Sequence, residues 1–261
     1  TAPRGERPED WHQYAGSVMS NQRADAVIDW LRRPAATRPR FLTLYFDAVD
    51  HAGHDFGPDA PQVRPALAEV DTAMARLLAG LTELNQPANL VIVADHGMAA
   101  TSSARAVPLD RIASPADYRV FDTGPYATLF AMPGHEGALE QALLRPHPHM
   151  QCWRKRDIPA RLRFGSNPRI PPYLCLAEIG WEIQKTTPVK PRTGGNHGYD
   201  NMAPEMRALF IAHGPAFAAG RVLPPFANTD VTPLLRDLLG LGPATGLDGD
   251  DAPFRSVLTR P

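Results

Sequence analysis

The sequence predicts an α/β fold in which a mainly parallel sheet is flanked by helices. Residues 40–46 and 90–94 are apolar runs with the β-prone composition of strands. Between them, residues 61–81 repeat apolar side chains at helical spacing, as an amphipathic helix does. A strand, a helix and a second strand in this order indicate a parallel pair joined by a crossover. The 28 prolines and 20 glycines favour such a core with long loops over a helical bundle.

The other segments predict two further helices and a smaller group of strands. Residues 21–31 predict a helix before the first strand, and a strand at 208–212 precedes a closing helix at 229–239. The alternation of strands and helices breaks at about residues 103–190, where the short strand candidates are 118–121, 127–132, 150–155 and 173–178. We therefore expect one domain that includes residues 1–261, with a smaller capping subdomain inserted at about 103–190.

Charge and composition exclude two classes of partner. The chain has a formal net charge of −1 and no long basic run, so we expect no binding to a nucleic-acid polymer. No stretch approaches the roughly 20 apolar residues of a membrane-spanning helix, so we expect no membrane span. The 43% hydrophobic content is that of an ordinary globular enzyme.

The pair Asp95-His96 follows the predicted strand at 90–94 directly. Ligands of open α/β sheets bind just beyond the carboxyl ends of strands. Aspartate and histidine are also ligands of Zn²⁺. Alone, the pair is equally consistent with an acid that caps a helix beside an incidental histidine.

A second acid and histidine cluster, residues 47–55, follows the predicted strand at 40–46. Asp50 and His54 are four residues apart and would share one side of a helical turn, but Asp47 and His51 have the same spacing, so spacing alone does not choose the pair. Nearby glycines favour a loop with tight turns over a long helix.

The third cluster contains His197, which stands among glycines in residues 193–201. Glycine permits close backbone approach and positive φ, which suits a loop that delivers one imidazole to a metal. The alternative is a surface turn with an incidental histidine. The three clusters together favour a metal site.

These three motifs resemble those of the nucleotide pyrophosphatase/phosphodiesterase family, in the alkaline phosphatase superfamily. The resemblance rests on the pattern Asp-x-x-Gly-His-x-x-Gly-Pro at 50–58, on Asp-His-Gly-Met at 95–98 and on His-Gly-Tyr-Asp-Asn at 197–201. It extends in order over most of the chain. It implies an alkaline-phosphatase-like core, of which this chain forms the C-terminal part.

The resemblance implies two zinc ions in one site. Asp50, His54 and His197 resemble the ligands of one zinc, and Asp95 and His96 resemble ligands of the other. Asp47 and His51 then become supporting or loop residues. Tyr45 resembles the aromatic residue that stacks on the nucleotide base, although it would also serve as an ordinary strand residue.

One departure from the family is large. The family's nucleophile is a threonine in a Thr-Phe-Pro-Asn-His-like context, and no such context occurs here. The resemblance implies hydrolysis of nucleotide phosphodiester or pyrophosphate bonds to nucleoside monophosphates through a phospho-threonine intermediate, so we expect a missing N-terminal segment to supply the threonine. We expect the chain alone to be inactive. The alternatives are a phosphomonoesterase or phosphonate hydrolase of the same superfamily, or a catalytically inactive zinc-binding module.

The two cysteines, Cys152 and Cys175, lie in short strand candidates of the capping subdomain. Neighbouring strands could bring them into bonding distance, but two buried free thiols are an equal alternative. The family is typically periplasmic or secreted, where disulfides persist. We therefore expect a periplasmic or secreted protein.

Overall fold

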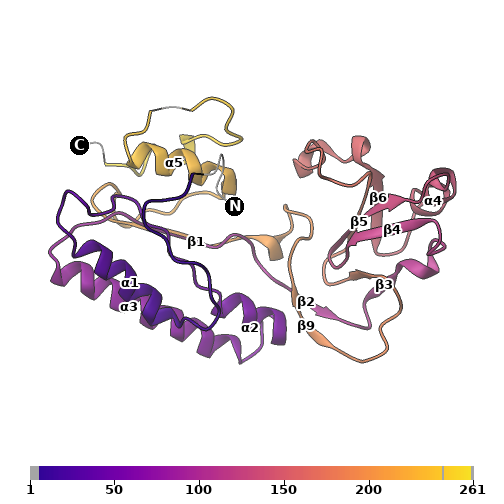
Figure 1. The fold of residues 1–261 in the computed structure, drawn as a ribbon, viewed down its shortest axis with the longest axis horizontal. Helices are drawn as coiled ribbons and strands as arrows, with labels where there is room; N and C mark the ends of the chain where they lie inside the picture. Colours follow the sequence, from indigo (N-terminus) through magenta and orange to yellow (C-terminus); the bar gives the residue numbers. More distant parts are fainter. Residues whose placement is uncertain (1–5, 243, 260–261) are drawn as a thin grey trace. The chain divides into compact units, whose positions relative to one another are not determined.

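The computed structural model describes residues 6–242 and 244–259. It divides into two compact units. One contains the chain up to Val49 together with Leu67–Gln86, and the other contains Asp50–Ala66 together with the chain from Pro87 onward. Figure 1 shows helices as the main elements of the first unit, whereas every labelled strand belongs to the second.

The first unit is built on α1 (Ser20–Leu31) and most of α3 (Val63–Glu83), which confirms the helices expected at 21–31 and 61–81. The two helices approach closely where Gly80 faces Ile28, since a Cβ on Gly80 would lie 2.6 Å from the Ile28 Cδ1 atom. Asp25 and Arg76 form an ion pair between them. The close contact explains a glycine within a long helix.

The strand expected at 40–46 is not formed. This segment forms neither a helix nor a strand, no described strand pairs with it, and residues 41–46 alternate between exposed and half-buried. A strand is stabilised by its hydrogen-bonded neighbour, so β-prone composition alone does not make one. The parallel pair expected between 40–46 and 90–94 is therefore absent from the described residues.

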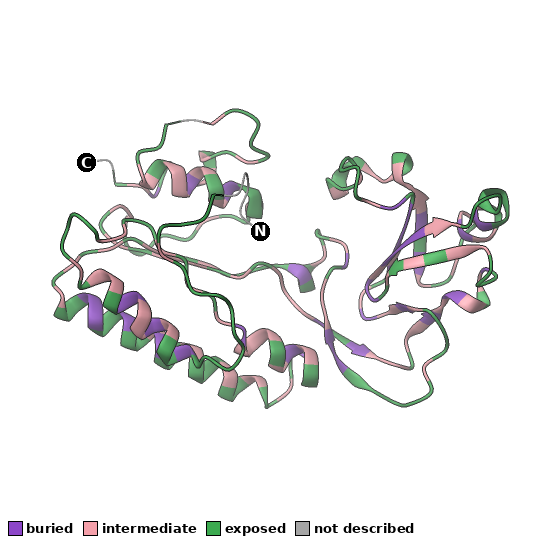
Figure 2. Ribbon diagram, viewed as in Figure 1, coloured by how far each residue is buried: buried purple, intermediate pink, exposed green. Residues whose placement is uncertain are grey.

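The expected strand at 90–94 is confirmed as β1 (Leu90–Val93), and that at 208–212 as β10 (Phe210–His213). The two pair antiparallel, with Leu90 opposite His213. Neither strand has a buried residue although both are largely apolar, and Val93 and Ile211 are each 48% exposed. Figure 2 draws β1 in pink and green without purple. The described chain thus leaves the apolar faces of these strands partly uncovered.

The remaining strands of the second unit form three sheets. Two are pairs: β2 (Ala99–Ser102) with β9 (Thr193–Asn196), antiparallel, and β3 (Ala106–Pro108) with β8 (Glu182–Gln184), parallel. The third has the order β4 (Tyr118–Asp122), β5 (Tyr126–Ala131), β7 (Tyr173–Ala177), β6 (Met150–Arg154). It confirms the four short strands expected there. The pairing differs from the expected parallel sheet, because only β3 and β8 run parallel among the described strands.

The main core lies around this antiparallel sheet. Leu129, Leu139 and Ile183 are fully buried there, and α4 (Glu136–Leu143) packs its leucines into the cluster. Cys152 and Cys175 face each other on β6 and β7 and form a disulfide, which decides between the two alternatives left open by the sequence.

A smaller apolar cluster gathers around α5 (Val231–Leu238), where Leu234 and Phe254 are fully buried. The closing helix expected at 229–239 is thus confirmed. Short 3₁₀ helices occur at Leu109–Arg111, Lys155–Asp157, Ala160–Leu162, Pro204–Met206, Asn228–Asp230 and Ala252–Phe254. Within the described ranges, every helix is too short or too polar to cross a lipid bilayer.

Candidate metal centre

The segment expected to be a loop with tight turns is a helix, α2 (Ala48–Phe56). The expectation treated Gly53 as a helix breaker, but this glycine is buried against Met98, and a Cβ at Gly53 would lie 3.0 Å from the Met98 Cε atom. The helix ends at Phe56, and the next residue, Gly57, has a φ of 93°, which glycine adopts readily. The helical turn brings Asp50 and His54 together, with Asp50 Oδ1 3.5 Å from His54 Nε2.

Strand β9 crosses α2 at very short range and carries His197 to the same place. A Cβ on Gly194 would overlap the carbonyl oxygen of His54, and a Cβ on Gly195 would overlap that of Gly53. Only glycine allows this approach. After His197, the buried Tyr199 joins the main core and anchors the loop. The close approach expected from the glycines is therefore present.

The Asp50 carboxylate is the central group of the cluster. Its Oδ1 atom is buried and accepts no hydrogen bond from any described residue. His54 Nε2 lies 3.5 Å away and His197 Nε2 lies 3.8 Å away. Two ligands bonded to one zinc at roughly 2.0–2.1 Å in tetrahedral geometry are about 3.4 Å apart. One atom from each of Asp50, His54 and His197 lies within 4.8 Å of the others, so the three residues fit a single metal ion.

Backbone carbonyls fix the orientation of two imidazoles. His54 Nδ1 donates to the Gly195 carbonyl over 2.9 Å, and His96 Nδ1 donates to the Gly97 carbonyl over 2.9 Å. A carbonyl only accepts, so the hydrogen of each neutral ring lies on Nδ1. Each Nε2 lone pair is then free to bind a metal, as in many metal sites of proteins.

Burial favours the neutral form of His197. The pKa of His197 is lowered first by burial and then by the neighbouring His96 and His54 imidazoles, against the opposing charge of Asp50. Neutral imidazole is the form that binds a metal. The site thus holds His197 ready for a cation near neutral pH.

Asp95 and His96 lie in a loop that is fixed through its backbone. The Asn228 amide donates to the Asp95 carbonyl over 3.2 Å, and the Gly97 N–H donates to the Met206 carbonyl over 3.1 Å. The His96 ring stacks on His197 with centroids 3.4 Å apart. Its Nε2 lies 3.4 Å from Asp95 Oδ1 and 4.0 Å from Asp50 Oδ1.

The Asp95 carboxylate itself is open to solvent, with a side-chain exposure of 76% compared with 28% for Asp50. The structure therefore brings His96 to the cluster more firmly than Asp95. Asn228 was not expected from the sequence, because its contact comes from a segment more than 130 residues away and no local motif signals it.

The alternative pair in the second motif is divided between the two units. Asp47 belongs to the first unit, where it is buried, pairs with Arg23 at 3.1 Å and accepts a hydrogen bond from Tyr14. His51 is exposed on α2. Tyr45 also lies in the first unit, 54% exposed and edge-on to Tyr14. Its role in base stacking stays a prediction.

Comparison with known proteins identifies the family. Residues 1–200 match the profile of type I phosphodiesterase / nucleotide pyrophosphatase. The chain belongs to this family. The phosphodiesterase family contains curated relatives such as human ectonucleotide pyrophosphatase/phosphodiesterase family member 5, 32% identical over 90% of this chain and 49% of the relative. The Xenopus laevis bis(5′-adenosyl)-triphosphatase enpp4 is 33% identical over 90% of this chain and 52% of the relative. The chain thus spans about half the length of these phosphodiesterases.

Solved structures of phosphodiesterase family members support the fold. Human family member 5 superposes with a TM-score of 0.89 at 30% identity, over 95% of this chain and 66% of the other. An inactive threonine-to-alanine variant of the murine protein, in complex with AMP, gives a TM-score of 0.88 at 31% identity with the same coverage. These likenesses confirm the alkaline-phosphatase-like α/β class.

Proposed function

We propose that this chain forms the zinc-binding part of a nucleotide pyrophosphatase/phosphodiesterase that releases nucleoside monophosphates. The observation that carries the proposal is the buried Asp50 Oδ1 atom, which has no hydrogen-bond partner among the described residues, with His54 and His197 Nε2 at 3.5 and 3.8 Å. A buried carboxylate oxygen without a partner is costly unless a cation or a donor satisfies it. Family membership makes a two-zinc phosphodiesterase site the interpretation that best fits this cluster.

In the proposed site, Asp50, His54 and His197 hold one zinc, and Asp95 and His96 contribute to the other. If bound there, divalent cations would supply positive charge to stabilise the oxygens of an in-line displacement at phosphorus. The chain's own residues orient this chemistry. Asp50 supplies the central negative charge, and the Gly195 and Gly97 carbonyls hold His54 and His96 with Nε2 free. The stacked His96 and His197 rings join the two halves of the site.

The proposed nucleophile is a threonine supplied by a segment N-terminal to this chain, which forms a phospho-threonine intermediate that water hydrolyses. Three observations support this proposal. The sequence lacks a threonine in the family's nucleophile context, and the threonine-to-alanine variant of the murine relative is inactive. The apolar strands β1 and β10 also have no buried residue within the described chain, as expected if a further segment covers them. We therefore propose that the chain alone has no turnover.

The proposed substrates are nucleotides, with Tyr45 stacking on the base. The solved murine relative holds AMP, and the Xenopus relative is a bis(5′-adenosyl)-triphosphatase. The Tyr45 ring is exposed enough to offer a face to a ligand. Polymeric nucleic acid is not a proposed substrate, because the chain has a net charge of −1 and no long basic run.

We also propose a periplasmic or secreted location. The Cys152–Cys175 disulfide supports it, since disulfides persist in oxidising compartments and are rare in the cytosol of most organisms.

The function is tested by hydrolysis of a nitrophenyl nucleotide diester, with the matching nitrophenyl monoester as the comparison. Zinc-loaded chain together with its N-terminal segment should hydrolyse the diester faster than the monoester, and the isolated 261-residue chain should hydrolyse neither. Faster monoester hydrolysis would favour the phosphomonoesterase alternative. Turnover by the isolated chain would contradict the proposed origin of the nucleophile.

Variants of two histidines locate the reaction. His54→Ala should abolish diester hydrolysis by the two-segment enzyme, because one zinc loses a ligand. His213→Ala removes an exposed histidine at the end of β10 and should leave the rate within about twofold, in line with the small effects of surface substitutions. An unchanged rate in His54→Ala would contradict the proposed role of His54 as a metal ligand. If the complete enzyme bound zinc without any turnover, the inactive-module alternative would replace the proposed function.

A further inference from the structure

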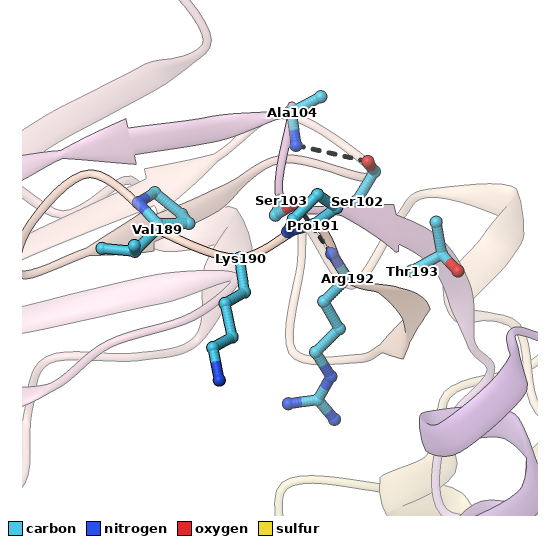
Figure 3. Close-up of a pocket in the computed structure, with 9 residues that line it drawn as sticks. Ser102, Ser103, Ala104, Val189, Lys190, Pro191, Arg192 and Thr193 are labelled. Carbon is cyan, nitrogen blue, oxygen red and sulfur yellow. Dashed lines mark hydrogen bonds between the residues drawn. The ribbon is translucent and has the colours of Figure 1, made fainter.

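A cavity lies at the end of the β2–β9 pair that is far from His197. It has a volume of about 410 Å³ and is lined by the turn after β2 and by the loop that leads into β9 (Figure 3). The lining contains Ser102, Ser103, Lys190, Arg192 and Thr193. We call it the β2–β9 cavity. It shares no residue with the proposed metal ligands.

The charge of the β2–β9 cavity is entirely positive. Residues 183–199 contain Lys185, Lys190 and Arg192 and no aspartate or glutamate. Lys190 and Arg192 are exposed and form no ion pair with any residue in the described ranges. Figure 3 shows both side chains extending from the same side of the loop. Two adjacent cations without a counter-charge favour an anionic ligand.

The hydroxyl groups of the cavity have hydrogens left to donate. Ser102 Oγ accepts from the Ala104 N–H over 3.2 Å, and Ser103 Oγ accepts from the Arg192 N–H over 2.9 Å. These bonds use oxygen lone pairs, so each O–H remains a donor for a ligand. A lining that offers cations and hydroxyl donors matches the several acceptor oxygens of a phosphate group.

The loop that carries the two cations has a restrained backbone. Pro188 and Pro191 fix φ at their own positions and bias the preceding residues, including Lys190, toward extended conformations. The Ser103 N–H donates to the Arg192 carbonyl over 2.8 Å and ties the loop to the turn after β2. Less conformational freedom is therefore lost when a ligand binds.

We propose that the β2–β9 cavity binds the phosphate groups of a polyphosphorylated ligand. The pairing steps from Asn196 to Thr193 place the cavity about 10 Å along the strand from the residue before His197, at about 3.3 Å per residue. Two sources have this chemistry: the distal phosphates of an elongated nucleotide substrate, or a separate polyphosphate. The first source rests on the proposed function, whereas the cavity's affinity for polyphosphate does not.

Calorimetric titration with inorganic triphosphate tests the site on the chelator-treated chain, so that binding to zinc does not contribute. We expect one triphosphate per chain. The double variant Lys190→Ala/Arg192→Ala should weaken binding at least tenfold. The double variant Arg145→Ala/Arg221→Ala removes the same charge from exposed arginines elsewhere and should change the affinity less than twofold. Thermal melting verifies that both variants fold.

Absence of triphosphate binding, or equal losses in the two double variants, would overturn the proposal. The zinc-loaded chain then separates the two sources. If Lys190→Ala/Arg192→Ala weakens binding of ATP but not of AMP, the cavity holds the distal phosphates of the substrate. If triphosphate and ATP bind together to one chain, the cavity holds a separate ligand. If the complete enzyme had no diesterase activity at all, only the proposed function would be contradicted, because triphosphate binding is measured independently of turnover.

Discussion

The two halves of the proposed zinc site differ in how completely this chain builds them. Asp50, His54 and His197 form a half in which side-chain exposures are 28%, 32% and 30%. Asp95, the acid of the other half, is 76% exposed, and only His96 beside it reaches the cluster. The first half is held by helix α2 and strand β9 at glycine contacts, whereas the second is held through backbone bonds of a loop.

This difference indicates which ion the chain can hold alone. Three protein ligands, one of them a buried carboxylate oxygen, suffice to hold a zinc ion that keeps one coordination position open. An exposed carboxylate and one imidazole do not. We therefore expect one zinc to bind tightly and the second to bind weakly until further ligands arrive.

The largest expected effect comes from the central carboxylate. Asp50→Asn keeps the shape of the side chain but removes its charge. It should lower the affinity for the first zinc by more than about 100-fold, which exceeds the loss typical of residues that only support a ligand. Asp95→Asn should change the first zinc's affinity less than about threefold, because its carboxylate faces solvent. Competition with a fluorescent zinc chelator measures both. Equal losses in the two variants would remove the distinction between the halves.

A smaller effect is expected from the glycine contact that unites α2 and β9. Gly195→Ala places a methyl group against the Gly53 carbonyl and 2.9 Å from the Met98 side chain. Overpacking of this kind costs about 1–3 kcal/mol of unfolding free energy. The variant should also weaken zinc binding, since the Gly195 carbonyl orients His54.

Gly137→Ala is the matched control for the glycine contact. Gly137 lies on α4, and a Cβ added there would meet no described neighbour within 4 Å, so the alanine should be neutral or stabilising by up to about 1 kcal/mol. Denaturant unfolding measures both variants. A Gly195→Ala protein as stable as Gly137→Ala, with unchanged zinc affinity, would show that the close approach is not required.

The smallest effect concerns an ion pair outside both halves. The pKa of Glu140 is lowered by its hydrogen bonds from Arg154 and, to a lesser degree, from Tyr173. A lowered carboxyl pKa stabilises the fold above the unfolded-state pKa, and that contribution is lost as pH falls through the folded-state value. Glu140→Gln should therefore lower Tm by only about 2 °C or less at pH 7, because the pair is partly exposed, and the difference should vanish in acid.

Zinc affinity at pH 7 should be the same in Glu140→Gln and the parent chain. Thermal melts from pH 3 to pH 7, together with a chelator competition, check both statements. A Tm difference that grew on acidification would reverse the predicted sign.

The sequence predicts the chemistry of the site better than its local structure. The Asp-His pair at 95–96 is recognisable because it follows an apolar strand directly. His197 is recognisable because it follows a glycine-rich segment. Helix α2 is not predicted because Gly53 is typical of a helix break, although it is there to admit Met98 and β9. That contact is tertiary and leaves no local signal.

The predicted strand at 40–46 shows the opposite limit. Its composition is β-prone, but pairing depends on a neighbour that composition does not specify, and the described chain provides none. The antiparallel pairing of β1 with β10 depends likewise on a segment about 120 residues away in sequence. The four strands at 118–177 are predictable because apolar and aromatic residues predominate in each of these short segments.

Anomalous diffraction at the zinc absorption edge, from crystals of the zinc-loaded chain, tests whether the two halves of the site hold zinc unequally. We expect one strong anomalous peak between Asp50 Oδ1, His54 Nε2 and His197 Nε2, with a weaker peak or none beside Asp95. Two peaks of equal strength would contradict the unequal halves. A strong peak elsewhere, with none at Asp50, would contradict the proposed metal centre itself.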